Sequence, residues 1–167
     1  MGIERPFTAS CATGEKPTAS GLLKSNFQTE VDGKKTDLFV LRNANNMEVC
    51  ITNFGGRIVS VMVPDREGVM RDVVLGFDSI RDYITIPSDF GASIGRYANR
   101  INQGRFTLDG VEYVLPRNNY GHCLHGGPNG FQYQVYMPGR LVRRNSSSPI
   151  FLRMEKKVFP AISLAKC

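Results

Sequence analysis

Short runs of β-branched and aromatic residues recur through the middle of the chain, and glycine, asparagine, aspartate or proline separates them. This pattern is typical of strands joined by tight turns. It predicts strands over residues 38–41, 48–54, 57–63, 72–75, 105–108 and 111–115. One short helix is expected over residues 79–83, with Asp78 or Ser79 as its N-cap. No strand alternates with a long helical segment, so the pattern favours an all-β, antiparallel fold of the sandwich or barrel class.

Two turns are indicated by their residue types. Asp65-Arg66-Glu67-Gly68 lies between two apolar runs and predicts a hairpin. Asp109-Gly110 predicts another, because a two-residue type I′ turn requires a positive φ at both positions and these residues tolerate it. The turns therefore support antiparallel pairing of neighbouring strands.

The two ends of the chain differ from its middle. Residues 1–25 mix threonine, alanine, serine, glycine and proline without periodicity, so we expect a flexible leader. Residues 137–167 contain seven of the 21 basic residues but only one of the 15 acidic ones, Glu155. The net charge of +6 therefore belongs to this tail, and the body is neutral. A neutral body favours neither a nucleic-acid nor a membrane partner, and we expect neither.

The four cysteines are widely spaced and form no CxxC pair, which argues against a zinc ribbon or a disulfide scaffold. We expect reduced thiols. No apolar run approaches 18 residues, so no membrane-spanning helix is expected. The N-terminus lacks the apolar stretch of an intact secretion signal. These features predict a cytoplasmic protein; an exported protein that has lost its signal is the alternative.

Residues 91–101 and 118–131 are polar, glycine-rich and aromatic without strand alternation, so we expect functional loops there. His122 and His125 are the only histidines. Their HxxH spacing is incomplete for zinc without a further ligand nearby, so no metal is expected. The segment 126–130 lacks the Lys-Ser/Thr ending of a phosphate loop, and no helix is expected after it. Nucleotide binding is therefore not expected.

Arg96, Asn99 and Arg100 place two guanidinium groups and an amide in one short span. Planar donors of this kind suit sugar oxygens as well as carboxylates. A histidine directly before two glycines, as His125 is, suits a sugar contact or an acid/base role, since glycines let a ligand approach the backbone. The structural alternatives are an arginine in an ion pair and a histidine hydrogen-bonded in a core.

Four segments carry a resemblance to a known family. They are ITNFGGRIVSVMVPDREG (51–68), DVVLGFDSIRDY (72–83), GRYANRINQGRFTLDGVEYVL (95–115) and CLHGGPNGFQYQVY (123–136). In this order and spacing they resemble the first part of galactose mutarotase, also called aldose 1-epimerase, over about residues 26–136. The resemblance implies a large antiparallel β-sandwich enzyme that interconverts the α and β anomers of free hexoses such as galactose and glucose. It implies no cofactor, and a small-molecule hexose as partner.

By motif match, Asn99 and Arg100 correspond to the family's sugar-binding Asn-Arg. His125 corresponds to the histidine of its LHGG string, which positions and polarises the sugar. In the family, a downstream histidine protonates the ring oxygen, and a glutamate takes the proton of the anomeric hydroxyl. No histidine follows His125 here, and Glu155 is the only acid after Glu112. His125 is thus the one catalytic residue that carries over, and we expect an inactive fragment. A non-catalytic carbohydrate-binding module is one alternative. A sugar-phosphate epimerase-like protein, in which Arg57, Arg96 or Arg117 would contact the phosphate, is another.

The resemblance stops after Tyr136, where the charge balance also changes. One base missing from the coding sequence near this point would explain the lost resemblance and the changed charge. Read in the shifted frame, the codons from Arg153 to Ile162 permit an acidic, glycine-rich string, DGEEGFPGN. We hypothesise a truncated sandwich over residues 26–136 and a frameshifted, basic tail over 137–167, with both termini of the chain disordered. A deliberate short isoform is the alternative. A truncated sandwich exposes strand edges, so self-association through them is expected.

Overall fold

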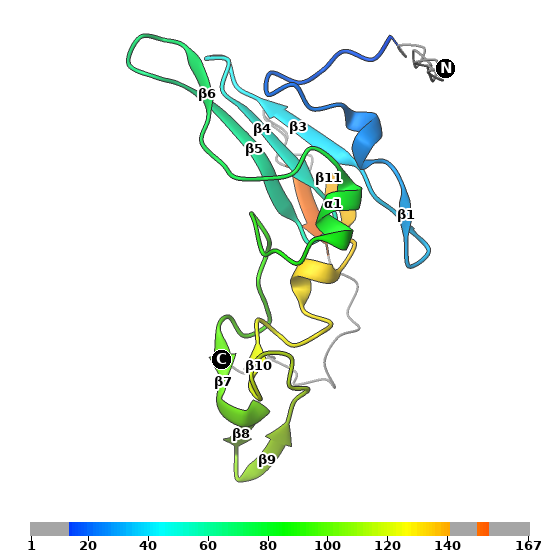
Figure 1. Cartoon of the computed structure of the whole chain (residues 1–167), viewed down its shortest axis with the longest axis vertical. Helices are drawn as coiled ribbons and strands as arrows, with labels where there is room; N and C mark the ends of the chain where they lie inside the picture. The colour runs from blue at the N-terminus through cyan, green and yellow to red at the C-terminus, as the bar shows by residue number, and fades with distance from the viewer. Residues whose placement is uncertain (1–13, 141–149, 154–167) are drawn as a thin grey trace, which may run out of the picture.

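The computed structural model describes residues 14–140 and 150–153 (Figure 1). Its helical segments are η1 (Lys24–Phe27), α1 (Ile80–Thr85), η2 (Asn102–Gly104) and η3 (Phe131–Tyr133). The strands are β1 (Glu30–Val31), β2 (Lys34–Lys35), β3 (Leu38–Arg42), β4 (Glu48–Thr52), β5 (Arg57–Pro64), β6 (Met70–Asp72), β7 (Arg100–Ile101), β8 (Arg105–Leu108), β9 (Val111–Val114), β10 (Cys123–Leu124), β11 (Met137–Arg140) and β12 (Ile150–Arg153). The described strands pair antiparallel, which confirms the predicted class.

The largest sheet has the order β3-β4-β5-β6. Leu38 lies opposite Thr52, and Glu48 lies opposite Met62. Along β4, buried and half-exposed residues alternate, because successive side chains of a strand point to opposite faces. The strands predicted from the pattern are therefore present as β3, β4 and β5, and the hairpin β8–β9 is also found.

Strand β6 lies earlier than the sequence predicts. The expected strand covered residues 72–75, whereas the paired residues are Met70–Asp72. The reason is the side chain of Asp72, whose Oδ1 accepts hydrogen bonds from the backbone N–H groups of Val61 (3.0 Å) and Val74 (3.1 Å). A carboxylate that binds backbone donors in this way competes with the regular ladder, and the strand ends there.

The predicted turns and helix start are confirmed. Asp65 Oδ1 accepts from the N–H groups of Glu67 (3.0 Å) and Val69 (2.8 Å), which closes the β5–β6 hairpin. Asp109 and Gly110 have φ values of 52° and 77°, as a type I′ turn requires. Ser79 is the N-cap of α1, since its Oγ accepts from the Asp82 N–H. Within the described residues, no helix has the length and apolar character needed to cross a membrane.

One face of the β3–β6 sheet forms the core together with η1 and α1 (Figure 1). Its buried cluster comprises Leu22, Phe27, Leu38, Cys50, Phe54, Val59, Ile80, Tyr83 and Val135. The segment before η1 is held to this sheet, because the Ala19 N–H donates to Oε1 of the buried Glu48 (2.7 Å). Residues 14–25 therefore differ from the predicted flexible leader, whose first part, 1–13, lies outside the described residues.

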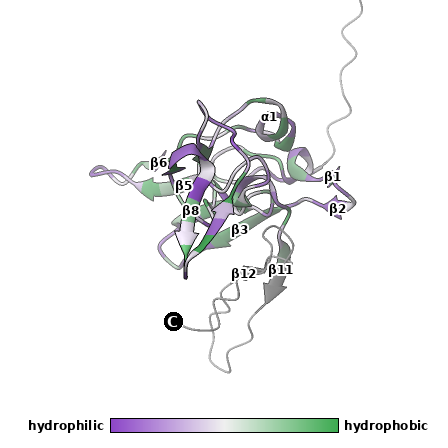
Figure 2. Ribbon diagram, turned by 90° about the horizontal axis from the view of Figure 1, so that it is seen from below, coloured by the Kyte–Doolittle hydropathy of each residue, from purple (hydrophilic) through white to green (hydrophobic). Residues whose placement is uncertain are grey.

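The opposite face of the same sheet is apolar and only partly covered. The residues that share this face are Phe39, Leu41, Val49, Ile51, Ile58, Val61 and Val63. None of them is buried, and Ile58 is 39% exposed. In Figure 2, β3 is coloured as hydrophobic along most of its length. We call these seven residues the open face.

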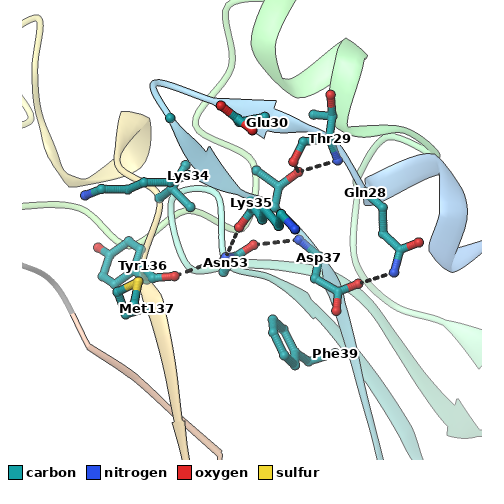
Figure 3. Close-up of a pocket in the computed structure, with 13 residues that line it drawn as sticks. Gln28, Thr29, Glu30, Lys34, Lys35, Asp37, Phe39, Asn53, Tyr136 and Met137 are labelled. Carbon is teal, nitrogen blue, oxygen red and sulfur yellow. Dashed lines mark hydrogen bonds between the residues drawn. The ribbon is translucent and has the colours of Figure 1, made fainter.

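A groove of about 790 Å³ lies at the end of β3, between residues 28–39 and residues 135–137. Asn53 forms its buried base (Figure 3). Its Oδ1 accepts from the Asp37 N–H (2.8 Å), and its Nδ2 donates to the carbonyls of Lys35 and Tyr136 (both 3.0 Å). One side chain thereby joins chain segments more than 80 residues apart.

The tail begins with an antiparallel pair. β11 pairs with β12, so that Met137 lies opposite Arg153 and Arg140 opposite Ile150. For these eight residues the predicted disorder is wrong, because they form a backbone ladder. Residues 141–149 and 154–167 lie outside the described residues.

Cys50 is a buried thiol on β4. Burial, with the negative charge of Glu48, raises its pKa to about 11. At pH 8.5 we therefore expect iodoacetamide to modify Cys50 about 100-fold more slowly in the folded chain than in urea, since only the thiolate reacts. Peptide mass spectrometry measures this rate for Cys50 separately from the other cysteines. Equal rates in buffer and in urea would contradict the assignment.

The same shift makes stability depend on pH. Between about pH 9 and 11 the folded chain keeps the Cys50 proton that the unfolded chain loses, so the free energy of unfolding falls as the pH rises. Burial also raises the pKa of Tyr83 and Tyr136, which act in the same direction. In Cys50→Ala, the free energy of unfolding should therefore fall less as the pH rises through this range.

Candidate functional site

The two loops singled out in the sequence lie side by side. Strand β7 pairs with β10, so Leu124 lies opposite Arg100 and Cys123 opposite Ile101. The Phe131 N–H donates to the Gly95 carbonyl (3.2 Å). This pair of loops lies beyond the end of the main sheet, on the side away from β6 (Figure 1). Residues from two distant parts of the chain therefore form one surface.

Glycine is required where the loops touch. A Cβ on Gly126 would lie 1.9 Å from the Gly95 carbonyl oxygen, and the φ of Gly126 is +84°. A Cβ on Gly95 would lie 2.4 Å from the ring of Phe131. Any side chain at either position would push the loops apart, so these two glycines set the distance between them.

His125 and Asn99 hold each other through two hydrogen bonds. The His125 N–H donates to the Asn99 carbonyl, and the Asn99 N–H donates to His125 Nδ1, both at 3.0 Å. Because Nδ1 accepts a backbone N–H, the neutral imidazole carries its proton on Nε2. His125 therefore offers Nε2–H as a donor to a bound molecule.

Both of these residues have unusual backbone conformations. The φ values are 64° at Asn99 and 53° at His125, in the left-handed region that favours glycine. Such conformations persist where the surroundings impose them, and they concentrate at ligand-binding sites. Here the two reciprocal hydrogen bonds impose them.

Arg100 is exposed beside this pair. Its Nε and Nη2 both donate to Asn119 Oδ1, at 3.0 and 2.8 Å. It forms no ion pair with any carboxylate of the residues that the structure describes. Nη1 keeps its donors for another partner. Asn119 was not singled out from the sequence, because nothing in its local pattern indicates a contact with a residue 19 positions earlier.

The other arginines of the sequence argument have different surroundings. Arg57 is fully buried and donates to the backbone carbonyls of Ser88, Phe90 and Gln132. It is therefore not available to a phosphate, which removes one support for the sugar-phosphate alternative. Arg96 lies over the ring of Phe131, with 5.6 Å between the guanidinium carbon and the ring centroid.

His122 repeats the arrangement of His125, since its Nδ1 accepts the Gln103 N–H (3.0 Å). In both histidines, Nδ1 is thus used within the protein. Across residues 14–140 and 150–153, no group of three or more histidine, cysteine, aspartate or glutamate side chains is placed to hold a metal ion.

The three predicted sugar-binding residues do not line the groove described above. That groove is formed by residues 28–39, Asn53 and residues 135–137. Asn99, Arg100 and His125 instead lie together on the surface where the two loops meet. The structure thus brings the three together, and it does so outside the groove of Figure 3.

The comparisons with known proteins indicate the same family. Residues 37–148 match the family model described as aldose 1-epimerase. The chain is 47% identical over 94 residues to a probable aldose 1-epimerase of Arthroderma benhamiae, which is 53% of this chain and 21% of that protein. It is 43% identical over 106 residues to the galactose mutarotase of Rattus norvegicus, which is 64% of this chain and 31% of that protein.

A solved structure shares the fold. The crystal structure of a GalM/aldose epimerase homologue from C. elegans superposes with a TM-score of 0.61 and 33% identity, over 64% of this chain and 33% of that chain. The chain thus spans about a third or less of the length of these proteins. The family match runs to residue 148, beyond Tyr136.

Proposed function

Because the chain belongs to the aldose 1-epimerase family, we propose that it carries the sugar-binding part of an enzyme that interconverts the anomers of free hexoses, with no cofactor. Asn99, Arg100 and His125 are the proposed binding residues. The observation that carries the proposal is the reciprocal hydrogen bonding of Asn99 and His125 beside Arg100, whose guanidinium forms no ion pair within the part of the chain that the structure describes.

Each residue has a distinct chemical task. His125 donates Nε2–H to a sugar oxygen, which holds the sugar and draws electron density from that oxygen. Arg100 supplies further donors and a positive charge, which favours oxygens that gain negative charge as the ring opens. The Asn99 side chain adds an amide, while its backbone fixes the tautomer of His125.

Galactose binding tests these assignments. We expect galactose to shift the amide signals of residues 95–100 and 123–127 in heteronuclear NMR spectra, with a dissociation constant in the millimolar range. His125→Ala and Arg100→Met should each weaken binding about tenfold, because each removes a directed donor. Arg66→Met is the control, since Arg66 lies in the β5–β6 turn and away from the site.

Two results would contradict the proposal. One is saturable binding that His125→Ala and Arg100→Met leave unchanged. The other is galactose-induced shifts confined to residues outside the two loops. Tighter binding of galactose 6-phosphate than of galactose would instead favour the sugar-phosphate alternative.

We also propose that the chain associates with a second copy of itself. The open face is apolar on three adjacent strands, and β3 and β6 are the edges of the described sheet. Burial of such a face removes apolar surface from water, and unpaired edges accept further strands.

Light scattering after size exclusion tests this association between about 1 and 100 μM. The apparent mass should rise with concentration, and the double variant Val49→Lys/Val61→Lys should stay monomeric. Val114→Lys is the control, since Val114 is an exposed valine on β9, outside the open face. A monomer at every concentration would rule the association out.

A further inference from the structure

We propose that Asn119 is a positioning residue that holds the guanidinium group of Arg100 ready for the sugar. The inference rests on the proposed function of Arg100. Asn119 Oδ1 accepts from Nε at 3.0 Å and from Nη2 at 2.8 Å. An exposed arginine otherwise samples many side-chain rotamers, and binding must then restrict them. Two hydrogen bonds to one fixed oxygen restrict the guanidinium before the sugar arrives.

The turn that carries Asn119 is itself rigidly built. The N–H groups of Asn119 and His122 each donate to the other residue's carbonyl, at 3.1 and 2.8 Å. Between them, Tyr120 and Gly121 have φ values of 46° and 79°, which closes a two-residue turn. The side chain of His122 then fixes the turn to η2, because its Nδ1 accepts the Gln103 N–H.

The preceding residue fixes the turn to the strand beside Arg100. Asn118 Oδ1 accepts the Leu124 N–H (2.8 Å), and Asn118 Nδ2 donates to the Leu124 carbonyl (3.1 Å). Leu124 lies opposite Arg100 in the β7–β10 pair. The carboxamide of Asn119 and the guanidinium of Arg100 are therefore presented by one connected unit, and their contact does not depend on a free loop.

The chemical type of the partner also matters. A carboxylate at this position would pair with the positive charge of Arg100 and compete with a sugar oxygen for it. The neutral amide oxygen orients two of the nitrogens without placing a negative charge beside the guanidinium. Nη1 and its two donors then remain available for the ligand.

Two measurements on the full 167-residue chain test the positioning. The first follows the Nε–H signal of Arg100 by NMR without sugar. It should exchange slowly with water in the unmodified chain and in Asn119→Asp, and rapidly in Asn119→Ala. The second is galactose affinity, which should fall about tenfold in Asn119→Ala and by no more than about threefold in Asn119→Asp, which keeps an acceptor. Asn45→Ala, an exposed asparagine in the β3–β4 turn, is the matched control.

The outcomes test the positioning of Arg100 by Asn119 separately from the proposed sugar binding. Rapid exchange of the Arg100 Nε–H in the unmodified chain would overturn the positioning, and so would unchanged galactose affinity in Asn119→Ala. Slow exchange of the Arg100 Nε–H in the unmodified chain and in Asn119→Asp, with rapid exchange in Asn119→Ala, supports the positioning. This measurement needs no sugar. If no variant then bound galactose, the proposed function would fail while the anchoring of Arg100 stood.

Discussion

Polarimetry of freshly dissolved α-glucose is expected to give the same relaxation rate with and without the 167-residue chain. Interconversion of anomers needs one group to take the proton of the anomeric hydroxyl and another to protonate the ring oxygen. Each such group accelerates the reaction roughly 10²- to 10⁴-fold. In the printed sequence, His125 is the last histidine, and Glu155 is the only acid after Glu112. Binding by Asn99, Arg100 and His125 alone would not open the ring.

The measurement uses an excess of chain, a weakly basic buffer at low concentration and a full-length family member as positive control. The full-length enzyme should shorten the relaxation in proportion to its concentration, whereas this chain should not. Acceleration that increases with the concentration of the chain and disappears in His125→Ala would disprove the expectation. Sugar binding without acceleration would match a carbohydrate-binding role.

Arg57→Met is expected to lower the free energy of unfolding by about 3 kcal/mol. The guanidinium lies in the core and donates through Nη1 to the carbonyls of Ser88 (3.1 Å) and Phe90 (3.2 Å), and through Nη2 to that of Gln132 (3.2 Å). It also lies over the ring of Tyr83, with its carbon 5.1 Å from the ring centroid. Methionine fills much of the volume but leaves these carbonyls without their donor.

Urea unfolding followed by circular dichroism measures this loss. Arg66→Met is again the matched control and should change the free energy of unfolding by less than about 0.5 kcal/mol, since an exposed side chain makes few contacts. Arg57→Lys should also be destabilised, because an ammonium group cannot reach three carbonyls with the fork of a guanidinium. A loss below about 1 kcal/mol in Arg57→Met would show that these hydrogen bonds contribute little net stability.

The buried Arg57 and the proposed sugar site are connected through the same chain segments. Arg57 fixes residues 88–90 and Gln132 to the sheet, and these positions flank the loops that carry Asn99 and His125. Loosening this anchor should therefore also reduce galactose affinity. The buried arginine thus links the stability of the sheet to the geometry of the proposed site.

Local features of the fold were predictable from the sequence because short-range physics sets them. Ser79 caps α1 through a donor three residues later, and Asp109-Gly110 adopts positive φ because its residue types permit it. The strand pattern likewise follows from the alternation of apolar residues. Asn99, Arg100 and His125 were identified through the motif resemblance, and the structure brings them together.

Contacts between distant residues were not predictable in this way. Leu22 looked like part of a flexible leader, yet it is buried because the sheet offers it a face to cover. Arg57 looked available to a phosphate, but its surroundings supply three carbonyls instead. Asn119 lies in one of the expected functional loops, but its contact with Arg100, 19 positions away, was not indicated.

The sequence by itself thus determined β3, β4, β5 and the β8–β9 hairpin, the two predicted turns, the cap of α1 and the family of the chain, because each depends on neighbouring residues or on an ordered motif. Only the tertiary structure decided which nitrogen of His125 carries the proton, which oxygen holds Arg100 and which arginine is buried. These features depend on atoms that folding brings together from separate segments, because a hydrogen bond forms only when its donor and acceptor lie a few ångströms apart.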